Sequence, residues 1–169
     1  KGEKSGPRLV YICHQDTVPL GDGWHHDPLA AEIIDGRMYG RGSCDMKSGL
    51  AAGMLAFRSI AAMGKKLKHD FLFIASMDEE DIMIGADKLI ADGIVRADDY
   101  VLDAEPTNGA IKVAHKGKTW FRLDAKGVAC HASTPEKGSD AVAALSEVIC
   151  AINRKLKALP VHPELGPCA

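Results

Sequence analysis

Three short runs of continuous apolar residues divide the first two thirds of the chain, at residues 8–13, 71–77 and 100–104. β-Branched or aromatic side chains fill much of each run, and a polar segment follows it. Apolar runs of this length that open into polar loops are typical of buried β-strands. We therefore predict three strands, each ending where the polar residues begin.

The segments between these runs carry the signals of helices and of a hairpin. A helix is predicted over 47–63, with Gly64 placed to end it. A second helix is predicted over 85–92, and the turn-forming pair Asp35-Gly36 predicts a short hairpin over 31–39. The apolar residues spaced as one face of the first helix are Leu50, Met54, Phe57 and Ala61.

Strands that are apolar throughout and alternate with helices predict an α/β fold, with a mostly parallel sheet flanked by helices. The pattern changes near residue 117. Residues 119–124 alternate like a half-exposed strand, 139–156 form an amphipathic helical pattern, and a proline-rich tail follows. We therefore predict two domains, 1–116 and 117–169, of which the second is the beginning of an α+β domain.

Composition narrows the classes of function. The chain has 169 residues, of which 46% are hydrophobic, and 21 basic and 23 acidic side chains are interspersed along it. No basic stripe indicates a nucleic-acid partner, and charged residues interrupt every apolar run before the roughly 18 residues that a membrane span needs. An odd number of scattered cysteines without a CxxC pair predicts free thiols and a cytoplasmic location; they are Cys13, Cys44, Cys130, Cys150 and Cys168.

The polar residues at the predicted strand ends are mostly metal-ligand types. In a parallel sheet, ligands bind beyond the carboxyl ends of the strands, so these side chains are expected to converge. His14 and Asp16 are two positions apart and share a face of an extended chain, which allows His14 to contact a metal while Asp16 orients its imidazole. The candidate residues are His14, Asp16, Asp45, Glu79, Glu80, Asp103 and Glu105.

Taken singly, each of these residues has an ordinary structural explanation. Asp45 precedes a helix as an N-cap does, Lys47 reads as a solvated charge, and paired glutamates are usually a solvated face. Acidic residues placed directly after apolar strands are nevertheless costly unless a cation relieves them. A phosphate-binding loop at 40–49 is excluded by spacing, because Met46 occupies the position before the lysine where that motif requires glycine.

The order of several motifs resembles the M20 family of metallohydrolases. These motifs are HQDTVP, WHHDP, DGRMYGRGSCDMKSGLAA, SMDEE, AEPT and GVACHASTPEKGSDA. They run from residue 14 to about residue 141 and look most similar to deacylases of the acetylornithine deacetylase and succinyl-diaminopimelate desuccinylase type. The resemblance implies a zinc-peptidase-like catalytic domain followed by a lid and dimerisation domain.

The resemblance also implies a dinuclear zinc site, with cobalt or manganese as alternatives. Asp45 would bridge the two ions, His14 and Glu105 would complete one site, and Glu80 would serve the other. A cis peptide is expected between Asp45 and Met46. The second ion should also receive a histidine from beyond residue 169, so the chain is expected to be the N-terminal part of a longer enzyme, cut before its last ligand.

The catalytic roles follow from the same resemblance. Glu79 would take a proton from the water that attacks the amide carbonyl, Asp16 would orient His14, and His131 would reach a neighbouring active site across a homodimer to steady the carbonyl oxygen. The expected substrates are N-acyl amino acids, as in amino-acid metabolism. Two alternatives stay open: a dipeptidase, tripeptidase or aminopeptidase with the same site, and an inert metal-binding fragment.

Overall fold

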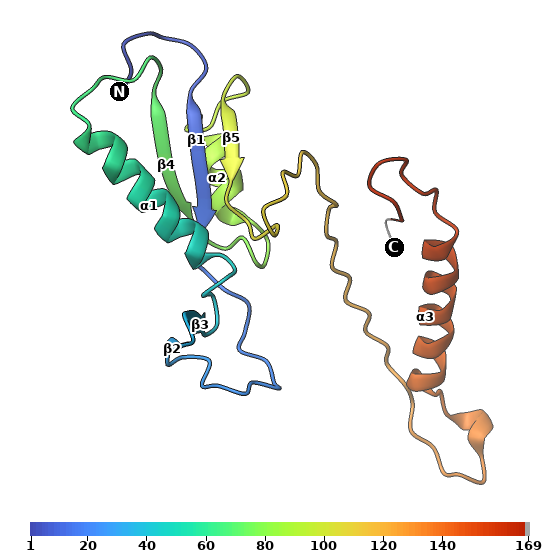
Figure 1. Cartoon of the computed structure of the whole chain (residues 1–169). Helices are drawn as coiled ribbons and strands as arrows, with labels where there is room; N and C mark the ends of the chain where they lie inside the picture. Colours follow the sequence, from blue (N-terminus) through green and yellow to red (C-terminus); the bar gives the residue numbers. More distant parts are fainter. Residues whose placement is uncertain (168–169) are drawn as a thin grey trace. The chain divides into compact units, whose positions relative to one another are not determined.

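The computed structural model describes residues 1–167 and divides into two compact units, with the division between Ala110 and Ile111. The first unit contains a three-stranded sheet, a small hairpin and two helices (Figure 1). Its elements are β1 (Leu9–His14), β2 (Glu32–Ile34), β3 (Arg37–Tyr39), α1 (Lys47–Ala62), β4 (Phe71–Ser76), α2 (Ile84–Ala91) and β5 (Tyr100–Asp103). The second unit contains a short 3-10 helix, η1 (Pro135–Lys137), and α3 (Ala141–Lys157).

The sheet has the order β4-β1-β5, and both pairings are parallel. His14 at the end of β1 lies in register with Ser76 at the end of β4, and Ile12 lies in register with Asp103 at the end of β5. The carboxyl ends of all three strands therefore meet at one edge. This parallel α/β arrangement confirms the predicted fold class.

Helix α1 packs against one face of the sheet through its glycines. A Cβ atom on Gly53 would lie 2.3 Å from Tyr11 Cε1, and one on Gly49 would lie 2.4 Å from the Ala104 carbonyl oxygen. The Tyr11 hydroxyl donates to the Gly49 carbonyl oxygen at 2.8 Å, and the Phe57 ring lies 5.4 Å from that of Phe71. The helix can approach the strands this closely only because two side chains are absent.

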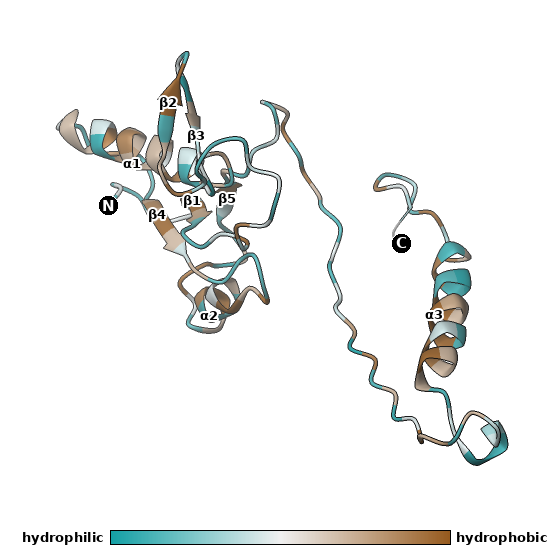
Figure 2. Cartoon of the chain, turned by 90° about the horizontal axis from the view of Figure 1, so that it is seen from below, coloured by the Kyte–Doolittle hydropathy of each residue, from teal (hydrophilic) through white to brown (hydrophobic). Residues whose placement is uncertain are grey.

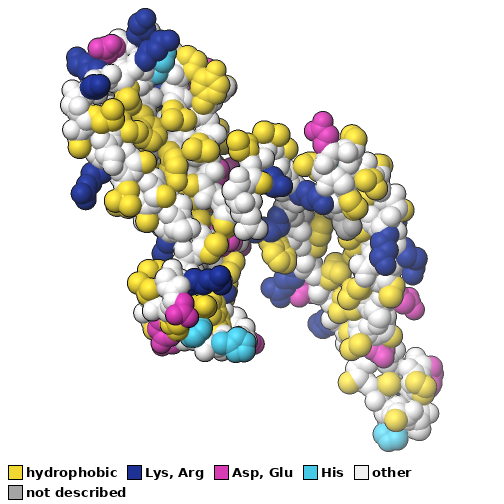
Figure 3. All heavy atoms as spheres, viewed as in Figure 1, with side chains coloured by type: hydrophobic (Ala, Val, Ile, Leu, Met, Phe, Trp, Pro, Cys, Tyr) yellow, Lys and Arg dark blue, Asp and Glu magenta, His cyan; other side chains and the backbone are white. Residues whose placement is uncertain are grey.

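The predicted apolar stripe of α1 is therefore only partly the face that contacts the sheet: Phe57 packs against Phe71 and Phe73 of β4, whereas Met54 does not. Met54 is 56% exposed, and Figure 3 shows hydrophobic side chains gathered along the open side of this helix. Helix α2 lies on the opposite face of the sheet from α1, as the two perpendicular views show (Figures 1 and 2). The sheet is thus flanked by one helix on each side.

The hairpin forms where it was predicted. Strands β2 and β3 pair antiparallel, and the two turn residues Asp35 and Gly36 both have positive φ, at 49° and 75°. Two positive φ angles suit the right-handed twist of a tight hairpin. The hairpin and the loop before it, residues 15–31, connect β1 to α1 beyond the carboxyl edge of the sheet (Figure 1).

In the second unit, a closed loop leads into α3. Val128 and Ser139 exchange two backbone hydrogen bonds of 2.9 Å, and Asp140 caps α3 by accepting from the backbone N–H groups of Val142 and Ala143. The strand predicted over 119–124 is wrong: no ladder forms there. Alternation alone does not make a strand, which needs a hydrogen-bonded neighbour, and none of the described residues provides one.

Two further expectations concern the whole chain. Four cysteines are free thiols, as predicted, and Cys168 lies outside the described residues. Among residues 1–167, no helix combines the length and the apolar character that crossing a bilayer requires.

Candidate metal centre

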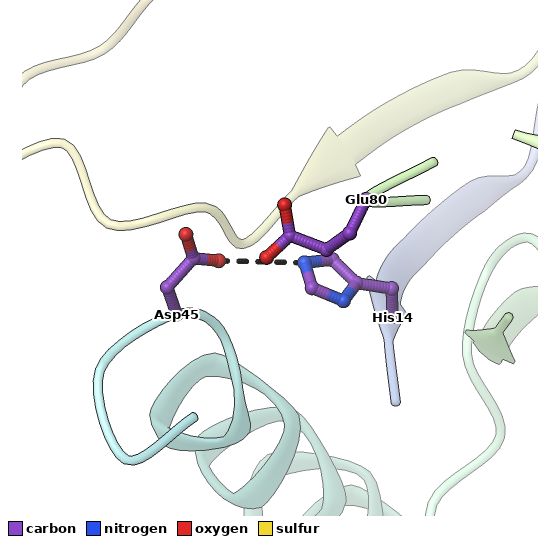
Figure 4. Close-up of side chains that lie close together, drawn as sticks. All are labelled: His14, Asp45 and Glu80. Atoms are coloured by element: carbon purple, nitrogen blue, oxygen red, sulfur yellow. Dashed lines mark ion pairs between the residues drawn. The ribbon is translucent and has the colours of Figure 1, made fainter. Parts of the chain in front are cut away.

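Five of the candidate ligands meet at the carboxyl edge of the sheet. His14 ends β1, Glu79 and Glu80 follow β4, Glu105 follows β5, and Asp45 lies in the loop before α1. Figure 4 shows His14, Asp45 and Glu80 directing their side chains toward one another from three different elements. The convergence predicted from the strand ends is therefore present in the folded chain.

His14 is the centre of this cluster and is 1% exposed. Its Nδ1 lies 3.0 Å from the main-chain carbonyl oxygen of Asp16. Because a carbonyl oxygen only accepts, Nδ1 carries the hydrogen, and Nε2 of the neutral ring presents a lone pair. That Nε2 atom is buried and has no hydrogen-bond partner.

Carboxylate oxygens surround this lone pair. Nε2 lies 3.3 Å from Glu105 Oε1, 3.4 Å from Asp45 Oδ1 and 3.7 Å from Glu79 Oε2. Acceptors facing acceptors repel one another unless positive charge lies between them. The donor set therefore fits a cation, which is either a proton on Nε2 or a metal ion.

The electrostatics of the cluster point the same way. Burial raises the pKa of Glu105 to about 7, and the negative charges of Asp45 and Asp103 add to the effect. Burial also raises the pKa of Glu79, against the opposing influence of His14. Burial alone lowers the pKa of His14, but Glu105 and the bond to the Asp16 carbonyl outweigh it, so this pKa is raised. Each shift shows that the cluster favours added positive charge.

Asp16 contacts His14 differently from the expected arrangement. Its carboxylate Oδ1 lies 3.5 Å from His14 Nδ1, whereas its main-chain oxygen makes the shorter contact. Oδ2 of Asp16 accepts from the backbone N–H of Glu80 at 3.1 Å. Burial alone raises the pKa of Asp16, but backbone hydrogen bonds, that of Glu80 foremost, hold it below its ordinary value. Asp16 thus connects the end of β1 to the loop after β4.

Met46 is a neighbour of the cluster that sequence reasoning did not single out as a site residue. It is fully buried, and its Sδ accepts from the backbone N–H of His14 at 3.1 Å. The expected cis peptide between Asp45 and Met46 is present. Met46 is also the N-cap residue of α1 and makes no side-chain cap bond, so Asp45 is not the N-cap that an ordinary interpretation assigns to it.

Two groups of side chains could hold a metal ion, each with ligand atoms within 4.8 Å of one another. One group is His14, Asp45 and Glu80, and the other is His14, Glu79 and Glu105. Both use His14, whose Nδ1 is already bonded, so a single nitrogen is available for coordination. Two ions therefore need a shared carboxylate or a further ligand besides these residues.

His131 lies in the second unit, on the loop closed by Val128 and Ser139. The backbone N–H of Ser133 donates to His131 Nδ1 at 3.2 Å, and the Ser133 Oγ lies 2.8 Å from the same atom. Nδ1 is therefore an acceptor, and the neutral ring carries its hydrogen on Nε2. The exposed imidazole can donate a hydrogen bond from Nε2.

Comparison with known proteins decides the family. A model of peptidase family M20/M25/M40 matches residues 10–165, nearly the whole chain. The chain belongs to this family. The M20 motifs that suggested the resemblance, from residue 14 to about 141, fall within the matched region.

Several individual M20 relatives extend the comparison. A succinyl-diaminopimelate desuccinylase of Rhodopseudomonas palustris (strain BisA53) is 33% identical over 160 residues, which cover 88% of this chain and 41% of the relative. An uncharacterized metallohydrolase of Methanocaldococcus jannaschii is 35% identical over 142 residues, covering 79% of this chain and 35% of the relative. The crystal structure of human carnosine dipeptidase 1 matches with a TM-score of 0.50 and 25% identity, over 61% of this chain and 23% of that one.

The extent of these matches limits what they say about the chain. The chain spans about two fifths of the length of the desuccinylases that it matches. Family and fold thus follow from the comparisons, whereas the activity of the whole protein is a matter for proposal.

Proposed function

We propose that this chain supplies the metal-binding part of a metal-dependent amidohydrolase, which cleaves N-acyl amino acids with a water molecule. The buried Nε2 of His14 carries this proposal, because it lacks a hydrogen-bond partner and faces three carboxylate oxygens 3.3–3.7 Å away. The match to desuccinylases supports an N-acyl substrate that bears a carboxylate.

The proposed ligand assignment uses one nitrogen and three carboxylates. His14, Asp45 and Glu105 would hold one ion, and Asp45 and Glu80 would hold the other. Zinc is the first choice, because nitrogen and carboxylate ligands suit it, with cobalt and manganese as substitutes. When bound, such ions polarise a substrate carbonyl and bring the pKa of a water molecule to about 7.

The remaining residues handle protons and orientation. Glu79 has a raised pKa, which suits a general base that takes a proton near neutral pH and then delivers it to the departing amine. Asp16 holds the His14 ring through its carbonyl oxygen. We assign His131 the role of donor to the carbonyl oxygen of the substrate, since its Nε2 carries the hydrogen.

The domain assignment belongs to the same proposal. Residues 1–116 would form the metal-binding domain, and 117–169 would begin a lid through which two copies associate as a homodimer in the cytoplasm. In a homodimer, His131 of one copy would serve the active site of the other.

A peptidase is the second candidate function. The matched solved structure is that of a dipeptidase, and the same carboxylate and histidine groups would serve hydrolysis of a peptide bond. Substrate class separates the two candidates, because the metal centre is shared.

Metal content and hydrolysis together test the proposal. The chain is titrated with zinc, cobalt and manganese, and hydrolysis is measured on N-succinyl-diaminopimelate, N-acetyl-ornithine and a dipeptide panel. Two ions with N-acyl hydrolysis support the proposal, and preferential dipeptide hydrolysis favours the peptidase. Metal binding without turnover favours a metal-binding module, and failure to bind any of the three ions overturns all of these assignments.

A further inference from the structure

Lys47 connects the two segments that carry His14 and Asp45. It is the first residue of α1 and follows Asp45 by two positions. Its Nζ donates to the main-chain carbonyl oxygen of Gln15 at 2.8 Å. Gln15 lies between His14 and Asp16, so one lysine hydrogen bond joins the loop before α1 to the segment that ends β1.

The exposed Lys47 side chain passes close to Gly42. The Lys47 backbone N–H donates to the Gly42 carbonyl oxygen at 3.0 Å, which closes the loop on itself. Gly42 has a φ of +80°, and a Cβ atom there would lie 2.6 Å from Thr17 Cγ2 and 3.0 Å from Lys47 Nζ. Because Gly42 has no side chain, there is space for the Lys47 ammonium to reach the Gln15 carbonyl oxygen.

Strand β4 also holds the Gln15 residue, through two hydrogen bonds. Its backbone N–H donates to the Ser76 carbonyl oxygen at 3.1 Å, and its side-chain amide donates to the Ala75 carbonyl oxygen at 3.2 Å. Strand β4 thus holds one side of Gln15 while Lys47 holds the other. The segment carrying His14 and Asp16 cannot shift relative to the Asp45 loop without losing one of these bonds.

We propose that Lys47 is a positioning residue of the metal centre: its hydrogen bond to Gln15 sets the separation of His14 and Asp45 before an ion binds. This inference rests on the proposed function. Partners that orient metal ligands typically contribute about 10–100-fold in metal affinity. Lys47 Nζ donates to a main-chain carbonyl oxygen and not to a metal ligand. Its expected effect on metal affinity therefore comes from positioning the backbone, and it requires a hydrogen-bond donor at the end of a long side chain.

Three variants of the whole chain test the inference through the dissociation constant for zinc, measured by competition with a chromophoric chelator. Lys47→Met keeps the stem and removes the donor, so it should weaken binding about 10–100-fold. Lys47→Arg keeps a donor and should lose less affinity than Lys47→Met. Lys65→Met, in the exposed loop after α1, is the matched control and should leave affinity unchanged.

Thermal unfolding of the metal-free chains separates positioning from general stability. The inference is overturned if the Lys47→Met chain is less stable yet binds zinc with parental affinity. It is also overturned if Lys47→Arg loses as much zinc affinity as Lys47→Met. Should Lys47→Met fail to fold, Lys47→Gln replaces it, with loss of affinity again expected. Absence of zinc binding by the parent chain overturns the proposed function itself, which is a distinct result.

Discussion

Carboxylates lie at both ends of the three-stranded sheet, but their surroundings shift their pKa values in opposite directions. At the amino end, Asp99 is a half-buried residue whose side chain is 0% exposed, and it accepts two bonds from the Arg8 guanidinium, at 2.6 and 2.8 Å. That guanidinium, with the Arg96 backbone N–H, holds the pKa of Asp99 well below its ordinary value. At the carboxyl end, burial and neighbouring acids raise the pKa values of Glu79 and Glu105 instead.

The contrast separates a carboxylate that is paired within the chain from the carboxylates that we propose to bind metal. A buried acid that serves packing has its cation supplied by the chain, as Arg8 supplies Asp99. Among the described residues at the carboxyl end, the group that faces the acids from the interior is His14, whose lone pair repels them unless it is protonated. Positive charge taken up from solution, as a proton on His14 or as a metal ion, would relieve this repulsion, which is the physical basis of the metal-site proposal.

The largest expected effect is on catalysis. Glu79→Gln removes the proposed base while keeping the size of the side chain, so the proposed turnover of an N-acyl amino acid, measured in an active enzyme that contains this chain, should fall by about 10²–10⁴-fold. Metal content should stay at the parental level, which elemental analysis measures. Asp81→Asn, a nearby exposed acid, is the control and should retain activity. Loss of metal together with activity would make Glu79 a ligand.

The next effect concerns metal affinity. Asp45→Asn removes charge from the carboxylate proposed to bridge both ions, so affinity should fall by more than the roughly 100-fold upper range of an orienting partner. Isothermal titration with zinc measures both the affinity and the number of sites. Retention of two sites with parental affinity would remove Asp45 from the metal centre.

At the amino end the expected effect is on stability alone. Asp99→Asn breaks the buried pair with Arg8 and leaves the guanidinium without its charged partner, so the unfolding midpoint should fall by roughly 5 °C or more. Folding lowers the pKa of Asp99. The stability that the ionised Asp99 contributes is therefore fully present above the pKa of Asp99 in the unfolded chain, and it is lost as the pH falls through the lower pKa of the folded state.

The neighbouring residue provides a matched control for that stability effect. Asp98 is 56% exposed and lies 3.4 Å from Arg96, so Asp98→Asn should shift the midpoint by about 1 °C at most. Zinc affinity should be unchanged in both variants. A large loss of metal binding in Asp99→Asn would break the distinction between the two ends of the sheet.

The sequence-based expectations succeeded where one local pattern determines the outcome. Continuous apolar runs define the strands, and the Asp35-Gly36 pair requires the positive φ angles of the hairpin. Parallel strands then bring residues that are distant in sequence to one edge, so the gathering of His14 with Glu105 follows from topology. These inferences need no knowledge of how individual side chains pack.

The failures concern contacts that depend on packing between elements. Apolar periodicity along α1 correctly included Phe57 but also selected the exposed Met54, and it missed the close glycine contacts of Gly49 and Gly53 with the sheet. The alternation over 119–124 predicted a strand that has no described partner. Lys47 is exposed, as its interpretation as a solvated charge implies, but its bond to the Gln15 carbonyl could not be predicted, because that acceptor is a backbone group that no side-chain pattern reveals.

The smallest expected effect is the pH dependence of the metal-free chain. Folding raises the pKa of Glu105 from its ordinary value of 4.5 to about 7, so the folded state binds more protons between these values and its stability falls as the pH rises through that window. The raised pKa of His14 acts in the same direction. The Glu105 carboxylate is 34% exposed, and solvent screening reduces the expected loss to about 1 kcal/mol between pH 5 and 8.

Denaturant unfolding at several pH values measures this slope with and without zinc. Bound zinc should remove most of it, because the ion replaces the proton as the positive charge among the carboxylates. Glu105→Gln should flatten the metal-free slope in part, since His14 still titrates. An unchanged slope in that variant would show that Glu105 does not cause the pH dependence. The contrast between the two ends of the sheet would then depend on the titration of His14 alone.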